Sequence, residues 1–228
     1  MLPIGDDPHH GRYAPVVTFA LIAVNVVAFL LELNQPSHDA LEALIASWGV
    51  VPGEYSAGRD LPPGIPLPFW ITLLTSMFLH GGWAHLGGNM LYLWIFGDNI
   101  ERMVGQLRFL VFYVVCGVAA GLAHILANSG SMVPTVGASG AISGVLGGYL
   151  VLFPHNRVRV LTRGGIVPVP AVMMLGLWIL IQFVNGMGAI ANTPETGGVA
   201  YLAHIGGFVA GAALVSLFAA GRRRLATA

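Results

Sequence analysis

Long apolar runs separated by short polar stretches form the main pattern of this chain. Six of these runs are long enough to cross a bilayer as helices, or nearly so, which takes roughly 17–25 apolar residues. The predicted spans are Pro15–Leu33, Ala84–Ile100, Phe109–Ala127, Gly137–Phe153, Ile166–Asn185 and Val199–Ala220. The fourth is short and rich in glycine. The pattern therefore predicts an all-α polytopic membrane protein, a six-helix transmembrane bundle in which residues 1–228 form one membrane domain.

The segment between the first two spans, residues 34–83, is not uniformly polar. Leu41–Trp48 and Ile71–Leu79 have the apolar content of short helices or re-entrant pieces. Proline breaks the chain between them at Pro62, Pro63, Pro66 and Pro68. We interpret the segment as a long structured first loop on the outer side, lying partly in the membrane interface.

Composition agrees with a membrane protein. Hydrophobic residues make up 56% of the chain and charged residues 9%, whereas about a quarter of a soluble domain is charged. The predicted surroundings are thus the lipid bilayer, and a net charge of zero gives no indication of a nucleic-acid partner. Lysine is absent, and the bias toward alanine, glycine and arginine is typical of a bacterium with GC-rich DNA. We therefore expect a bacterial plasma membrane.

The distribution of arginine predicts the orientation, because cytoplasmic loops carry an excess of positive side chains. With the N-terminus inside, nine of the ten arginines fall on inner segments, and only Arg59 falls outside. The N-terminal segment, residues 1–14, and the basic tail, residues 221–228, are then both cytoplasmic. The second, fourth and sixth spans all begin at the outer face.

This orientation places four polar side chains at one depth. His85 and Asn89 lie in the first turns of the second span, Ser139 lies at the start of the fourth, and His204 lies about five residues into the sixth. At about 1.5 Å of rise per residue, all four are a turn or two below the outer surface. Only arginine was used to orient the chain, so this convergence is an independent observation.

Ser139 and His204 are the candidate catalytic residues. A serine is a poor nucleophile until a base takes its proton, and His204 has the depth to act as that base and then as acid for the leaving amine. The alternatives are a serine and a histidine that only pack, but an ionisable group in a membrane span favours a function. Small-residue ridges beginning at Gly140 and at Gly207, the latter continued by Gly211, would allow the two spans to approach closely.

His85 and Asn89 are four residues apart and therefore share one helical face. Their imidazole and amide groups are candidate donors to an oxyanion, beside the backbone N–H of Ser139. An interhelical polar clasp is the alternative, and His80 is expected to be a structural hydrogen-bonding residue. No acid shares this depth, so the residues predict a Ser–His dyad. Neither a cofactor nor a metal is predicted, because the histidines lack a nearby acidic ligand and a His-Glu-x-x-His run.

Together these motifs resemble the rhomboid family of intramembrane serine proteases, from about Trp70 to Gly211. The similarity lies in a Gly-x-Ser-Gly nucleophile motif at 137–140, a His-x-x-x-Asn pair at 85 and 89, and an Ala-His-x-x-Gly-x-x-x-Gly signature at 203–211. It implies the basic six-helix bacterial form. It also implies that Ser139 is the nucleophile and His204 the base. The implied oxyanion donors are His85, Asn89 and the backbone N–H of Ser139. The implied structural residues near the site are Gly137, Gly140, His80, Gly207 and Gly211.

The sequence departs from that family at Ser143, where many relatives carry an aromatic residue that stacks on the base. The orientation of His204 must then come from elsewhere, for example from Tyr201 or the outer loop. We also interpret the fifth span, with Gln182 and Asn185 near its outer end, as the element that moves to admit a substrate helix, and the outer loop 186–198 as a mobile cap.

The predicted function is an intramembrane serine endopeptidase that cleaves transmembrane or juxtamembrane segments of other membrane proteins. One alternative is a catalytically silent rhomboid-like protein that binds membrane clients, which would be expected to lose the serine or the histidine. Another is a small transporter, which requires polar groups through the whole depth and an internal repeat. No oligomeric state is predicted.

Overall fold

The computed structural model describes residues 2–7, 13–192 and 199–220. Its helices are α1 (Val16–Leu33), α2 (His38–Trp48), α3 (Pro52–Ala57), α4 (Thr72–Thr75), α5 (Trp83–Val104), α6 (Gln106–Ala127), α7 (Ser139–Leu152), α8 (Ala171–Asn192) and α9 (Tyr201–Phe218). Two 3₁₀ turns flank α4, namely η1 (Phe69–Ile71) and η2 (Ser76–Phe78). Strands β1 (Leu2–Gly5), β2 (Arg157–Thr162) and β3 (Gly165–Pro170) form an antiparallel sheet in that order. This mostly helical architecture confirms the predicted fold class.

Four helices have the length and apolar composition of membrane spans: Val16–Leu33, Gln106–Ala127, Ala171–Gly188 and Tyr201–Phe218. They correspond to the first, third, fifth and sixth predicted spans. The second corresponds to α5, which has 22 residues but carries charged side chains in its last turns. The fourth corresponds to α7, which has only 14 residues. The count of six crossings and the assignment of sides remain predictions.

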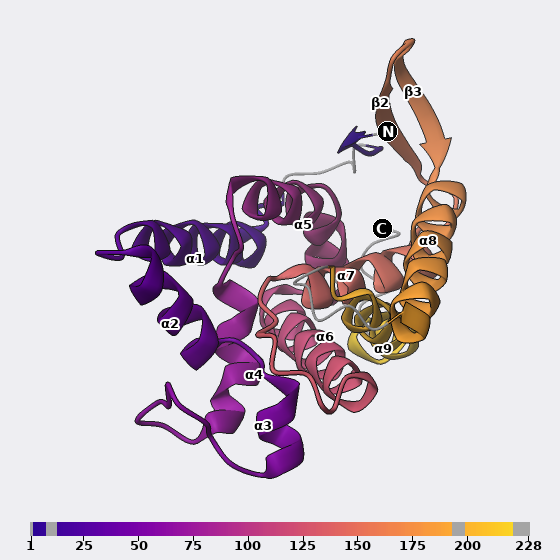
Figure 1. Cartoon of the computed structure of the whole chain (residues 1–228). Helices are drawn as coiled ribbons and strands as arrows, with labels where there is room; N and C mark the ends of the chain where they lie inside the picture. The colour runs from indigo at the N-terminus through magenta and orange to yellow at the C-terminus, as the bar shows by residue number, and fades with distance from the viewer. Residues whose placement is uncertain (1, 8–12, 193–198, 221–228) are drawn as a thin grey trace.

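Helix α7 forms the centre of the bundle. Every residue from 140 to 149 is buried, and α7 packs against α5, α6 and α9 (Figure 1). A helix that is apolar on all sides is stable only when it is enclosed in this way. Because the helix begins at Ser139, this residue marks the point where the connecting loop enters the interior of the bundle.

The two ends of α1 are tied to the chain around α5 by buried carboxylates. Glu101 is fully buried and accepts hydrogen bonds from the backbone N–H groups of Val17 and Thr18, at 3.0 and 2.7 Å. These N–H groups have no partner within their own helix, and the helix dipole favours a negative charge beside them. At the other end, Glu32 accepts from the backbone N–H of His80 at 3.1 Å. Both acids therefore serve the packing of α1.

The fifth predicted span begins too early. Residues 166–170 belong to β3, which pairs with β2, and the helix starts at Ala171 and continues to Asn192. Pro168 and Pro170 lack an N–H group, which confines them to an edge strand such as β3. The β2–β3 hairpin extends away from the bundle beyond the start of α8 (Figure 1), and β1 pairs with it through Leu2 and Leu161.

The first loop contains the helical pieces that its pattern predicts. Leu41–Trp48 lies within α2, and Ile71–Leu79 is covered largely by α4 and η2. Helices α2, α3 and α4 lie at the opposite side of the molecule from the β2–β3 hairpin (Figure 1). The basic tail 221–228 and residues 193–198 of the predicted cap lie outside the described residues. The rest of that cap, residues 186–192, is the last part of helix α8 and not a loop.

Candidate active site

Ser139 and His204 meet between the first turns of two neighbouring helices. Ser139 is the first residue of α7, and His204 lies in the first turn of α9. The Oγ atom of Ser139 lies 2.8 Å from Nε2 of His204, within the range at which a base takes a proton from a nucleophile. His204 is 9% exposed and Ser139 is half-buried. The hydroxyl is thus both shielded from bulk solvent and reachable.

Glycine allows α7 and α9 to approach until their backbones touch. A Cβ atom added at Gly207 would collide with the carbonyl oxygen of Gly140, and one added at Gly211 would collide with that of Gly144. Small residues permit this approach between membrane helices. The glycine ridges therefore set the distance between the helices, and with it the distance between Ser139 and His204.

Replacing Gly211 with alanine is expected to destabilise the protein by about 1–3 kcal/mol, the usual cost of overpacking, and to lower any activity that depends on the dyad. The obstructing atom is backbone and cannot rotate away. Gly176→Ala in α8 is the matched control, because nothing lies within 4 Å of its added Cβ atom. Thermal unfolding in detergent compares the two, and equal stability would show that the close contact is not required.

The loop that enters α7 depends on Gly137. Its φ of +124° lies in the region that side chains disfavour, and its N–H donates to the carbonyl of Ser76 at 2.8 Å. An added Cβ atom would lie 2.7 Å from Nε2 of His85 and 3.6 Å from Nδ2 of Asn89. Both side chains of α5 therefore reach the loop two residues before Ser139, and only glycine leaves room for them.

The side chains of His85 and Asn89 both present hydrogen-bond donors to the loop at Gly137. The N–H of Gly81 donates to Nδ1 of His85 at 3.3 Å, so in the neutral ring the proton is carried by Nε2, the atom that faces Gly137. Nδ2 of Asn89 is buried and has no hydrogen-bond partner among the described residues. A buried amide without a partner is costly and calls for an explanation. Two donors that reach the loop two residues before Ser139 are suited to binding negative charge.

Residues 68–221 match the sequence profile of the Rhomboid domain. This chain belongs to the rhomboid family. It is 36% identical over 204 residues to the rhomboid protease GluP of Bacillus subtilis (strain 168), covering 88% of this chain and 35% of GluP. It is 34% identical over 145 residues to the mitochondrial Rhomboid protein 1 of Saccharomyces cerevisiae, covering 62% of this chain and 40% of that protein. The chain thus spans well under half the length of either relative.

A further Bacillus subtilis rhomboid protein, YdcA, is 31% identical over 176 residues, which are 76% of this chain and 79% of YdcA. The family and the apolar helices together make this rhomboid an integral multi-pass membrane protein. The matched region contains Ser139, His204, His85 and Asn89 and excludes α1, α2 and α3. The polar cluster therefore lies in the part of the chain that carries the likeness.

Among the described residues, the groups that orient His204 in this rhomboid come from α8, where Tyr201 or the outer loop had been predicted. Oε1 of Gln182 lies 2.7 Å from Nδ1 of His204. The Trp178 ring packs at 5.9 Å from the imidazole, tilted by 32°. The signal in the sequence was an amide and an indole four residues apart in a mostly apolar helix, which places both on one face. The hydroxyl of Ser143 donates to the Ser139 carbonyl at 2.6 Å and does not contact the histidine ring.

His80 lies beside the site without joining it. Its ring packs edge-on against His85, with the centroids 5.2 Å apart, and against Phe29 at 6.5 Å. Its backbone N–H is the group that Glu32 binds. His80 thus connects the C-terminal end of α1 to the first turn of α5, where its ring packs against that of His85.

A small cavity of about 30 Å³ adjoins Ser139. Its polar lining includes His124 and Thr135, whose Nε2 and Oγ1 atoms lie 2.8 Å apart. One water needs roughly 10–15 Å³ of such space and two to four polar partners. The cavity can therefore hold one or two water molecules next to the serine.

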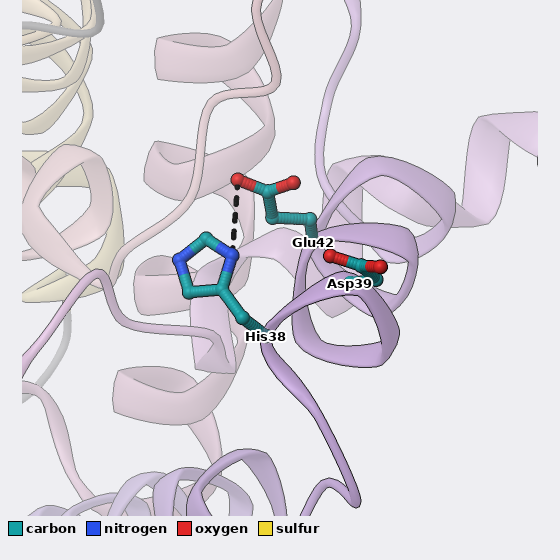
Figure 2. A group of neighbouring side chains, drawn as sticks. All are labelled: His38, Asp39 and Glu42. Carbon is teal, nitrogen blue, oxygen red and sulfur yellow. Dashed lines mark ion pairs between the residues drawn. The ribbon is translucent and has the colours of Figure 1, made fainter.

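A second group of polar side chains lies on α2 and shares no residue with this site. His38, Asp39 and Glu42 occupy the first turns of α2, where an ion pair of 3.4 Å joins His38 to Glu42 (Figure 2). All three are exposed. Acidic residues are favoured at a helix N-terminus for their interaction with the dipole, so the group is explained as a solvated helix start.

Proposed function

We propose that this rhomboid is an intramembrane serine endopeptidase in which Ser139 is the nucleophile and His204 the base. The observation that carries the proposal is the 2.8 Å contact between Oγ and Nε2 at the buried start of α7. His204 takes the hydroxyl proton as Oγ attacks the scissile carbonyl, which gives a tetrahedral oxyanion. The protonated ring then donates that proton to the leaving amine. An acyl-enzyme remains, and water hydrolyses it by the same steps.

Three donors would stabilise the oxyanion: the backbone N–H of Ser139, Nε2–H of His85 and Nδ2 of Asn89. The positive end of the α7 dipole would add to them. Fixed donors in a site without bulk water are effective because they need no reorganisation as charge develops. The unpartnered amide of Asn89 supports this role, since it leaves a donor free until the intermediate forms.

The substrates would be transmembrane or juxtamembrane segments of other membrane proteins. In a helix within lipid every backbone carbonyl is hydrogen-bonded, so the scissile bond becomes accessible only where the helix unfolds. Small or helix-breaking residues are therefore expected near the cut. The hydrolytic water would come from the cavity beside Ser139. The arginine pattern supports a site near the outer face of a bacterial plasma membrane, with both termini in the cytoplasm.

A covalent probe tests this function without knowledge of the natural substrate. The protein, purified in detergent, is treated with a biotinylated fluorophosphonate, and the adduct is mapped by mass spectrometry. We expect one adduct at Ser139, and none in His204→Ala, because an unactivated serine does not react. A folded parent protein that stays unlabelled and cleaves no single-span substrate would instead favour the silent client-binding rhomboid. Retention of both Ser139 and His204 argues against that alternative.

A further inference from the structure

We propose that Gln182 is a positioning residue that fixes the tautomer and orientation of His204, so that the base is competent only while α8 is docked against α9. The inference rests on the proposed function and deepens it. It assigns to a neutral amide the role that a carboxylate has in a Ser–His–Asp triad, where the third residue holds the imidazole in the correct tautomer.

The chemistry of the contact determines the tautomer. Oε1 of an amide can only accept a hydrogen bond, so at 2.7 Å from Nδ1 of His204 it requires that Nδ1 carry the proton. Nε2 is then unprotonated and has a lone pair for the hydroxyl of Ser139, 2.8 Å away. This is the tautomer that a general base needs. The opposite tautomer would donate to Oγ and could not activate it.

Burial shows that Gln182 is held against the histidine. Helix α8 is the most peripheral of the four apolar spans in the described chain, with 22% of its span buried against 39% for α6 and 33% for α9. Gln182 is nevertheless only 8% exposed, whereas Asn185, the next amide along the helix, is exposed. Trp178, one turn before Gln182, covers the imidazole from the same helix face.

Among the described residues, no carboxylate orients the ring. The side chains hydrogen-bonded to His204 are those of Gln182 and Ser139. Glu101 and Glu32 are engaged with the two ends of α1. The ring therefore depends on α8 for its hydrogen bond at Nδ1 and for its stacking partner. Any displacement of α8 away from α9 removes both, which links the docking of this helix to the competence of the base.

Three variants within α8 test the role. Gln182→Met keeps the length of the side chain and removes the acceptor, whereas Gln182→Glu keeps an acceptor oxygen at the same reach. Asn185→Leu is the matched control, a loss of an exposed amide one turn away. For each we would measure kcat and KM on a model single-span substrate, Tm in detergent, and the ¹⁵N spectrum of labelled histidine, with the His204 signals assigned by difference from His204→Ala.

We expect Gln182→Met to lower kcat by about 10- to 100-fold, a share of the roughly 10²–10⁴-fold that general base catalysis contributes. KM and Tm should stay close to those of Asn185→Leu. Gln182→Glu should recover most of the loss. In the parent, the His204 spectrum should show a protonated Nδ1 and an unprotonated Nε2, and Gln182→Met should convert this to a mixture of tautomers.

Two results would overturn the inference: a kcat for Gln182→Met within twofold of the control, or a parent spectrum in which Nε2 is the protonated nitrogen. A loss of activity that follows a fall in Tm, with unchanged tautomer signals, would show a purely structural role and would also overturn it. The spectrum of the parent tests the tautomer without any Gln182 variant and needs His204→Ala only for assignment. It also needs no activity, so a parent that neither cleaves nor reacts with fluorophosphonate refutes the proposed function separately.

Discussion

Replacement of Ser139 with alanine is expected to abolish cleavage of a single-span substrate. Loss of the nucleophile in soluble serine proteases costs on the order of 10⁵- to 10⁶-fold in kcat, and a loss of that size would bring cleavage to background. The fold should be unaffected, because Oγ of Ser139 is hydrogen-bonded to the side chain of His204 and alanine suits the start of α7. Product formation over hours, followed on gels, measures the effect.

Ser143→Ala is the matched control for this experiment. It removes a hydroxyl one turn further along the same helix, where Oγ of Ser143 only donates to the carbonyl of Ser139. We expect it to keep activity within about threefold of the parent, since a back-bonded helix serine contributes little. Cleavage that survives Ser139→Ala, or that is lost equally in both variants, would exclude Ser139 as the nucleophile.

Much of this arrangement could be predicted because it depends on local pattern. Apolar length located α1, α6 and α9 to within a few residues, and prolines in the first loop separated its helical pieces. The positions of Ser139 and His204 within their apolar runs indicated a common depth, and the glycines of α7 and α9 indicated close packing. These signals are readable because each lies within a single helix or in the spacing between helices along the chain.

Other features depend on contacts that no local pattern encodes. The apolar run through residues 165–170 reads equally well as the start of a helix, since a short apolar segment has no period that separates strand from helix. It became β3 through pairing with β2 and β1. Likewise, the rotation of α8 about its axis decides which amide faces the interior. Gln182 turned toward His204 and Asn185 toward the exterior, a choice set by packing against α9.

Replacement of Asn89 with leucine is expected to lower kcat by about 10²- to 10³-fold, the usual effect of removing one oxyanion donor. Leucine has a similar volume, and Nδ2 of Asn89 makes no hydrogen bond in the described structure. The folded ground state therefore loses no hydrogen bond at Nδ2 when the amide is removed, and burial of an apolar group there should leave Tm unchanged or raise it. KM should change little, because the donor is used only once the oxyanion forms.

The same variant separates the oxyanion role from an interhelical polar clasp. A clasp stabilises the folded protein, so its loss would lower Tm and reduce kcat only as far as unfolding does. The combination with His85→Ala sharpens the distinction, since two donors to one oxygen act as a unit and their effects on kcat should be less than multiplicative. His85 also has a ground-state bond from the N–H of Gly81, so some loss of stability is expected from that change alone. If Asn89→Leu lowered Tm while kcat stayed within threefold, the amide would be a packing group and the oxyanion would depend on His85 and the Ser139 backbone.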